Sequence, residues 1–164
     1  MILASQNQFH FLSDILKKTP DATALIYGGP TYPDIRGIVC FYQLSEGVLL
    51  FVQVSGLPYD QGPCGSRMFG FHIHEGSTCT GNSQNPFADT RGHYNPDNCQ
   101  HPHHAGDLPP LFGNNGLAYQ SVFTNRFAVD EVIGRTMIIH INPDDFTTQP
   151  SGNSGAEIAC GQIV

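Results

Sequence analysis

The chain has 164 residues, of which 40% are hydrophobic and 13% are charged, and this length suits one domain, residues 1–164, with one sizeable core. Its 14 acidic and 7 basic residues give a net charge of −7 without any basic cluster, which argues against nucleic acid or an anionic membrane as a partner. No stretch approaches the roughly 20 apolar residues that a transmembrane helix needs.

The beginning of the chain does not have the pattern of a secretory signal peptide. The short apolar run over residues 1–4 is followed at once by polar residues, and the first lysines, Lys17 and Lys18, come too late for a leader. We therefore expect a cytoplasmic protein, or an extracytoplasmic one if a leader was removed from the sequence.

The first element that the pattern predicts is a short helix over residues 9–18, within an N-terminal helical extension over residues 1–20. Four apolar residues recur there at helical spacing, and Pro20 ends the segment. We expect this face to cover part of the main fold or a partner. His10 lies apart from the other histidines, and we interpret it as a surface residue. The apolar residues of the face are Phe9, Leu12, Ile15 and Leu16.

Beyond residue 20 the hydrophobic period changes to two, which is the period of a β-strand. Segments rich in Val, Ile, Phe and Tyr alternate with turn residues, and the 18 Gly and 12 Pro favour strands and turns over long helices. Seven or eight short strands of this kind predict an all-β sandwich or barrel. The predicted strands span residues 22–27, 35–43, 48–55, 68–74, 116–124, 136–141 and 157–163.

Two connections, residues 76–115 and residues 142–156, are unusually long for a compact domain. Loops beyond about 12–15 residues are usually functional or disordered. The first connection holds four of the eight histidines. A metal ion that crosslinks it would give this polar segment the order that its own apolar residues cannot provide.

Seven of the eight histidines lie between residues 72 and 140, and imidazole is the commonest protein ligand for copper and zinc. His72 and His74 stand at positions i and i+2 of a predicted strand, so both side chains project from one face and can reach one metal ion. His140 ends another, apolar strand. Alone it would suit a hydrogen-bonded core histidine, but beside this pair we interpret it as a third ligand.

A second group, in the first long connection, has the composition of a zinc site. His93, His101, His104 and Asp107 would supply three nitrogen atoms and one oxygen atom, which close a tetrahedral zinc site. His103 competes with its neighbour for this role. We choose His104, which stands three residues before Asp107 with a glycine between them, and we expect His103 to face solvent.

The five cysteines are an odd number, and their spacing alone leaves the pairing open. Four could form two disulfide bonds, with one left over. We expect the fifth to be Cys40, in the middle of a predicted strand, as a buried and inert thiol. The others are Cys64, Cys79, Cys99 and Cys160.

Five short motifs, in order along the chain, resemble the copper/zinc superoxide dismutase family, and its bacterial branch in particular. The resemblance runs from about residue 22 to the C-terminus. It implies an eight-stranded Greek-key β-barrel that holds its metals outside the barrel, in two long loops. The motifs are GFHIHE at 70–75, GHYNP at 92–96, HAGDL at 104–108, GRTMIIH at 134–140, and GNSG with ACG between 152 and 161.

The resemblance also implies the roles of individual residues. His93 would bridge the two metals as an imidazolate and carry a proton for catalysis. Asp144 would link a copper-ligand histidine to a zinc-ligand one and so fix both rings. The implied copper ligands are His72, His74, His93 and His140, and the implied zinc ligands are His93, His101, His104 and Asp107.

By the same resemblance, Cys79 and Cys160 match the family's disulfide bond, which anchors the first long loop to the last strand. This leaves Cys64 and Cys99, besides the isolated Cys40. They form either a second disulfide bond or two free thiols, and both alternatives stay open.

The family's reaction is the disproportionation of superoxide, a small anion, to dioxygen and hydrogen peroxide by redox cycling of copper; a homodimer is left open. Two residues depart from the family pattern. Glu157, three residues before Cys160, replaces the arginine that guides the anion, and Phe69 stands where many members have a histidine. We expect Glu157 at the mouth of the channel to slow the enzyme. The second hypothesis is a non-catalytic copper/zinc-binding protein on the same fold, for metal storage, delivery or sensing.

Overall fold

The computed structural model describes residue 15 and residues 17–164. The helix that we expect over residues 9–18 falls mostly outside this part of the chain, as does His10, and it stays a prediction. None of the helices that the structure describes is long and apolar enough to cross a membrane.

The described residues form nine β-strands, one short α-helix and one 3-10 turn. The strands are β1 (Ala22–Gly28), β2 (Arg36–Leu44), β3 (Gly47–Ser55), β4 (Met68–Phe69), β5 (Phe71–His74), β6 (Leu111–Phe112), β7 (Ala118–Thr124), β8 (Thr136–His140) and β9 (Glu157–Gln162). The 3-10 turn is η1 (Ala88–Thr90) and the helix is α2 (Val129–Val132).

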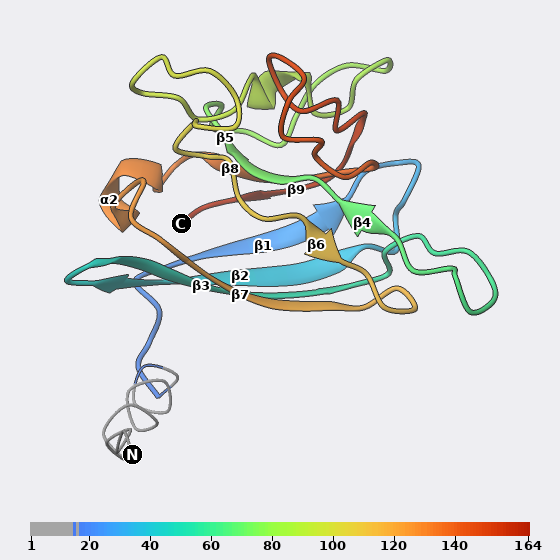
Figure 1. The fold of residues 1–164 in the computed structure, drawn as a ribbon, viewed down its shortest axis with the longest axis horizontal. Helices are drawn as coiled ribbons and strands as arrows, with labels where there is room; N and C mark the ends of the chain where they lie inside the picture. The colour runs from blue at the N-terminus through green and yellow to red at the C-terminus, as the bar shows by residue number, and fades with distance from the viewer. Residues whose placement is uncertain (1–14, 16) are drawn as a thin grey trace.

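Seven strands form one antiparallel sheet in the order β5-β8-β9-β1-β2-β3-β7, and β4 pairs with β6 in a two-stranded ladder. The long sheet curls on itself (Figure 1). Because β4 leads into β5 and β6 leads into β7, the short ladder links the two edges of the long sheet. The expectation of an all-β barrel is confirmed. Neighbours such as β3 and β7, which are not consecutive, give the crossing connections of a Greek key.

The predicted strand over residues 68–74 is divided at Gly70, because it changes its partner there. Its first two residues pair with β6 and its last four pair with β8. The Gly70 amide donates a hydrogen bond to the Asn142 carbonyl, and the Gly70 carbonyl accepts one from the His140 amide. If β4 and β5 are counted as one strand, the barrel has eight strands, and β6 is one of them. The sequence pattern predicts a loop at residues 111–112, because two residues are too few to show a period.

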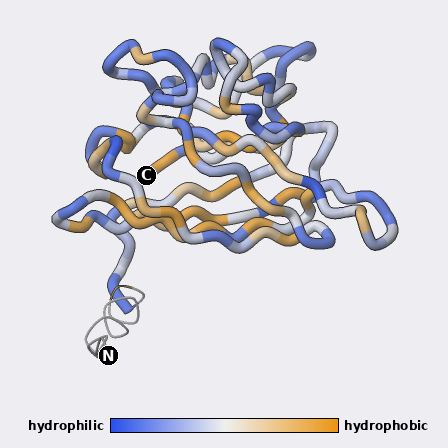
Figure 2. Tube along the Cα trace, in the orientation of Figure 1, coloured by the Kyte–Doolittle hydropathy of each residue, from blue (hydrophilic) through white to orange (hydrophobic). Residues whose placement is uncertain are grey.

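Apolar side chains from all parts of the curled sheet fill its interior. Phe41 on β2, Leu50 on β3 and Phe71 on β5 have no solvent exposure. Phe69, which stands where the resemblance predicts a histidine, is also fully buried and faces Leu111 across the short ladder. Figure 2 shows the hydrophobic residues along the strands and the hydrophilic ones in the loops. At position 69 an apolar ring therefore fills the core.

A disulfide bond joins Cys79 in the first long connection to Cys160 on β9, as the resemblance implies. Cys64 and Cys99 are exposed free thiols, so the alternative of a second disulfide bond is wrong. They lie in different connections, between β3 and β4 and between β5 and β6, and no strand pairing brings them together.

Cys40 is only partly buried, which corrects the expectation of a fully buried thiol. Side chains alternate along a strand, and here Val39 and Phe41 take the inward positions. Cys40 therefore faces outward, where it packs against a small apolar cluster that includes Ile15, Tyr42 and Leu49. Burial in this cluster raises the pKa of the Cys40 thiol.

The two long connections lie over the same end of the barrel, above β5, β8 and β9 (Figure 1). Residues of the second connection contact the first, since the Gln149 side chain bonds to the main chain of His101. The first long connection, which holds four of the seven potential metal ligands, is therefore supported by the second.

Candidate metal centre

The pairing of β5 with β8 brings three histidines together. His72 and His74 lie on β5, and His140 ends β8. The ring centroids of His72 and His74 lie 5.0 and 5.3 Å from that of His140. The Nε2 atoms of His74 and His140 are 3.2 Å apart. All three residues are buried, so their ring atoms meet each other in place of water.

The first long connection adds His93 to this group. Here the chain runs back beside β5, where the Tyr94 amide donates to the Ile73 carbonyl and His93 forms an isolated bridge with His74. The His93 ring centroid lies 3.9 Å from that of His72. The potential ligand atoms of the four histidines all lie within 4.8 Å of one another. We call these residues, His72, His74, His93 and His140, the first ligand group.

A second ligand group consists of His93, His101, His104 and Asp107, whose ligand atoms also lie within 4.8 Å of one another. The Nδ1 atom of His93 is 2.7 Å from the Asp107 carboxylate, and those of His101 and His104 are 3.1 and 3.4 Å from it. His103 is exposed and belongs to neither group. The structure thus brings together both sets of ligands that the sequence predicts, and His93 is common to them.

Four ring nitrogen atoms of these groups are buried and form no hydrogen bond with the described residues, although two of them lie within 3.4 Å of the Asp107 carboxylate. An unpaired buried polar atom costs about 1–3 kcal/mol, so each one needs an explanation. A metal ion would give every lone pair a partner, since imidazoles suit copper and three imidazoles with one carboxylate suit zinc. The residues therefore fit the two metals. The four atoms are His72 Nδ1, His93 Nε2, His101 Nδ1 and His104 Nδ1.

Asp144, in the second long connection, links the two groups through one histidine of each, His72 and His101. Its Oδ2 atom lies 2.8 Å from Nε2 of His72, and its Oδ1 atom lies 2.9 Å from Nε2 of His101. Burial alone would raise the pKa of this carboxyl, but hydrogen bonds from His72, the Phe146 amide and His101 outweigh it and hold the pKa well below its ordinary value. An ionised Asp144 accepts N–H bonds at both Nε2 atoms and leaves both Nδ1 lone pairs for metals.

Burial also keeps three histidines of the first group, His72, His74 and His140, neutral. Loss of water lowers the pKa of His72 to about 4 and that of His140 to about 3, and nearby histidines add to the effect. The same causes hold the pKa of His74 well below its ordinary value. A histidine must be neutral to bind a metal, so these rings are ready to do so at neutral pH.

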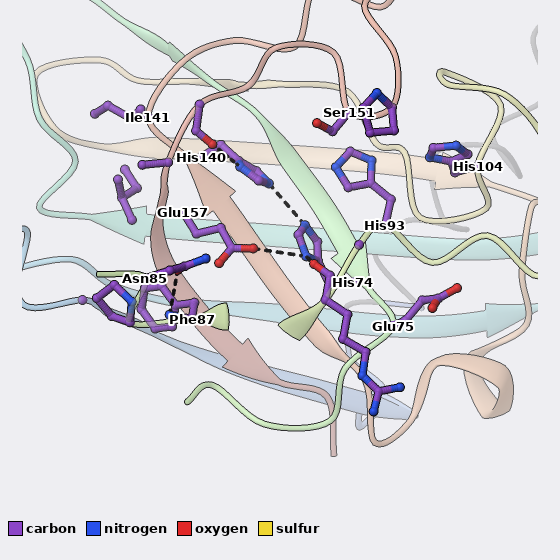
Figure 3. A pocket seen from close by; sticks show the side chains of 18 of the residues that line it. His74, Glu75, Asn85, Phe87, His93, His104, His140, Ile141, Ser151 and Glu157 are labelled. Carbon is purple, nitrogen blue, oxygen red and sulfur yellow. Dashed lines mark hydrogen bonds and ion pairs between the residues drawn. The ribbon is translucent and has the colours of Figure 1, made fainter. Parts of the chain in front are cut away.

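A pocket of about 1000 Å³ lies over the two groups. The residues that line it include His74, His93 and His140 of the first group and His104 of the second (Figure 3). A small solute in this pocket therefore reaches ring atoms of the histidines from both groups.

Comparison of the sequence with known proteins shows the family to which the chain belongs. The sequence pattern of the copper/zinc superoxide dismutases matches residues 35–163. The chain belongs to the copper/zinc superoxide dismutase family. A Cu-Zn superoxide dismutase of Legionella pneumophila is 34% identical over 151 residues, which cover 87% of this chain and 86% of that protein.

Two further relatives carry different names, one a superoxide dismutase and one a superoxide dismutase-like protein. A Cu-Zn superoxide dismutase of Deinococcus radiodurans is 33% identical over 145 residues, 77% of this chain and 76% of that protein. A superoxide dismutase-like protein of Bacillus subtilis, YojM, is 37% identical over 112 residues, 58% of this chain and 55% of that protein.

Glu157, at the position where the resemblance predicts a guiding arginine, lines the pocket beside His74 (Figure 3). Its Oε1 atom accepts a 2.9 Å hydrogen bond from the Thr90 hydroxyl and lies 3.4 Å from Nδ1 of His74. Its side chain is 11% exposed, so it sits deeper than the channel mouth where we expected it. Burial raises the pKa of this carboxyl.

Two contacts that hold the loop over residues 101–107 had no signal in the sequence. The Gln149 side chain accepts from the His101 amide at 3.0 Å and donates to the His101 carbonyl at 2.7 Å. Arg126 donates from Nη1 to three main-chain carbonyl groups of the loop. These contacts join main-chain atoms to residues far along the chain, so no motif spacing reveals them. The carbonyl groups that Arg126 contacts are those of Pro102, His104 and Asp107.

Proposed function

We propose that this protein disproportionates superoxide to dioxygen and hydrogen peroxide with one copper and one zinc ion, and that His93 bridges the two metals. The shared position of His93 carries the proposal. Its Nδ1 atom faces Asp107 in the second group. Its Nε2 atom is buried without a partner, and its ring lies against that of His72 in the first group. An imidazolate between two cations would use both nitrogen atoms.

Copper, when bound by the first group, would supply the one-electron oxidation and reduction of superoxide. Two superoxide anions and two protons give one dioxygen and one hydrogen peroxide, so the reaction needs a proton beside the site. His93 would hold and release this proton at Nε2, while the second group keeps its ring in place through Nδ1. Asp144 would fix the rings of His72 and His101 by accepting both Nε2–H bonds.

Glu157 would make the enzyme slower than a family member with an arginine at this position. A carboxylate in the wall of the pocket, next to His74, repels an anionic substrate instead of attracting it. Electrostatic steering changes association rates by roughly 10–10³. The charge of this one residue therefore bears directly on the rate.

Two substitutions of Glu157 test this effect. Glu157→Gln removes the charge and keeps an oxygen atom for Thr90, and Glu157→Arg reverses the charge by two units. We expect the rate constant for superoxide to rise severalfold in the first variant and by about tenfold or more in the second at low salt. The gain should shrink as ionic strength rises, because ions screen the charge, while copper content stays constant. Rates equal to the parent at every salt concentration in both variants would show that Glu157 does not limit encounter.

A non-catalytic copper/zinc-binding protein, for metal storage, delivery or sensing, is the second candidate. The negative charge of Glu157 in the pocket favours it. The decay of superoxide in the presence of protein loaded with copper and zinc separates the two candidates. Catalysed decay that a metal-free sample lacks supports the dismutase. A full metal load with no decay above the metal-free sample would contradict it and favour the second candidate.

A further inference from the structure

The pocket over the metal centre contains one fixed positive charge. Of the lysine and arginine residues that the structure describes, Arg91 is the one that lines this pocket. The other charged residues in its lining are Glu75 and Glu157. An anion that enters the pocket therefore meets two carboxylates and a single guanidinium group.

The position of Arg91 is fixed by the first ligand group itself. Its carbonyl oxygen accepts a 2.9 Å hydrogen bond from Nδ1 of His74. It stands two residues before His93, after the end of η1, and its amide donates to the Ala88 carbonyl. The base of the Arg91 side chain is thus held between two potential ligands of copper.

The main chain at Arg91 has a conformation that favours glycine. Its φ and ψ angles are 64° and −146°, a combination that residues with a side chain rarely adopt. Strained residues of this kind cluster at functional sites, where the surrounding structure holds them in place. A long cationic side chain at such a position calls for a reason that packing does not give.

The side chain of Arg91 is also free to meet a solute. The residue is exposed, and its guanidinium group forms no hydrogen bond or ion pair with the described residues. Arg126 and Arg135, by contrast, donate to main-chain carbonyl groups, and Arg36 does so as well. The charge of Arg91 is therefore not paired with any described residue, and Arg91 is one of the residues that line the pocket.

We propose that Arg91 attracts the anionic substrate into the metal pocket and so performs from the first long loop the task that an arginine at position 157 would perform. This inference rests on the proposed function for the identity of the anion, superoxide. Arg91 acts as a steering residue because its positive charge attracts the anion. Glu157, which also lines the pocket, repels the anion and so acts against it.

Rate measurements on four variants test this role. Arg91→Ala and Arg91→Gln should lower the rate constant for superoxide about threefold or more at low ionic strength, and the salt dependence should become flatter. Arg91→Lys keeps the charge and should retain most of the rate. Lys18→Ala is the matched control, since it also removes one exposed positive charge, but from the segment before β1, across the barrel from the metal loops (Figure 1). It should leave the rate close to that of the parent.

Azide binding to the protein loaded with copper(II) and zinc gives a second measurement that needs no turnover. Azide is a small anion whose binding to copper is followed by absorption spectroscopy. Arg91→Gln should raise the dissociation constant of azide about threefold at low salt, and Arg91→Lys should restore it. A change in azide affinity without any turnover by the parent would refute the proposed function and leave the steering role of Arg91 standing. Azide affinity and salt dependence that match the parent in Arg91→Gln, at equal copper content, would overturn the inference.

Discussion

At the scale of single residues, one carboxylate determines which nitrogen atoms face the metals. Asp144 accepts from Nε2 of His72 and from Nε2 of His101, and neither side chain has any solvent exposure. An amide in its place would offer one acceptor and one donor. One of the two histidines would then meet a donor and would have to turn or change its protonation.

Asp144→Asn should therefore lower the affinity for both metals by about 10–100-fold, which is the usual effect of losing a partner behind a metal ligand. Competition with chelators of known affinity measures both constants. Asp145→Asn is the matched control, because Asp145 is exposed and its side chain bonds, among the described residues, only to the nearby Thr147 and Thr148. If the two variants bind metal equally well, the role that we give to Asp144 is wrong.

The buried histidines also predict how the metal-free protein responds to acid. An unfolded histidine has a pKa near 6.5, whereas burial lowers the pKa of His72 to about 4 and of His140 to about 3. Between these values the unfolded chain binds more protons than the folded one, so the free energy of unfolding falls as pH falls. Each of the two histidines contributes on the order of 2 kcal/mol of this loss by pH 5.

Urea denaturation of the metal-free protein at pH 7 and at pH 5 measures this loss. We expect the protein to be clearly less stable at pH 5. Glu157 acts in the opposite sense, because burial raises its pKa, but it is one group against the histidines. Equal stability at the two pH values would mean that the histidines are accessible to protons in the folded metal-free protein.

At the scale of elements, the hydrophobic period and the turn residues predict where the long strands lie. They do not predict the short strand β6 or the change of pairing partner at Gly70. The run Gly113-Asn114-Asn115-Gly116 consists of turn residues and forms a turn, since Asn114 and Leu117 bond to each other around Asn115 and Gly116, which both have positive φ angles. The breaks in pairing near Gly70 and the two-residue strand β6 depend on partners far along the chain. Local sequence carries no signal for such tertiary choices.

The disulfide bond between Cys79 and Cys160 is the covalent link between the loop and β9. The two residues are 81 positions apart, and closing a loop of this length is worth about 4–5 kcal/mol in the chain-entropy description. Cys160→Ser should lower the melting temperature by on the order of 10 °C. Calorimetry on this variant and on Cys64→Ser, which removes an exposed free thiol, gives the comparison. Equal melting temperatures for both would show that the bond adds no stability.

At the scale of the whole molecule, paired strands of the barrel supply three histidines, and the first long loop supplies the other four ligands. The second long loop adds Asp144, which bonds to His72 and His101. The motifs were sufficient to select both ligand groups, because a metal site requires particular residue types at particular places. They could not reveal Arg91 or Arg126, because the proposed roles of these residues depend on the position of each in the folded chain, Arg91 at the pocket and Arg126 at the loop carbonyl groups. The sequence leaves open whether the protein forms a homodimer. Sedimentation equilibrium, which measures the mass in solution, tests this.

The central claim is that two metals share His93. It predicts that the protein, supplied with both ions in excess and then freed of unbound metal, contains one copper and one zinc per chain. His104→Ala should lose zinc and keep most of its copper, because His104 belongs only to the second group, whereas the exposed His103→Ala should keep both. Elemental analysis of these three proteins gives the answer. Zinc alone at full occupancy in the parent, with copper supplied in excess, would contradict the account.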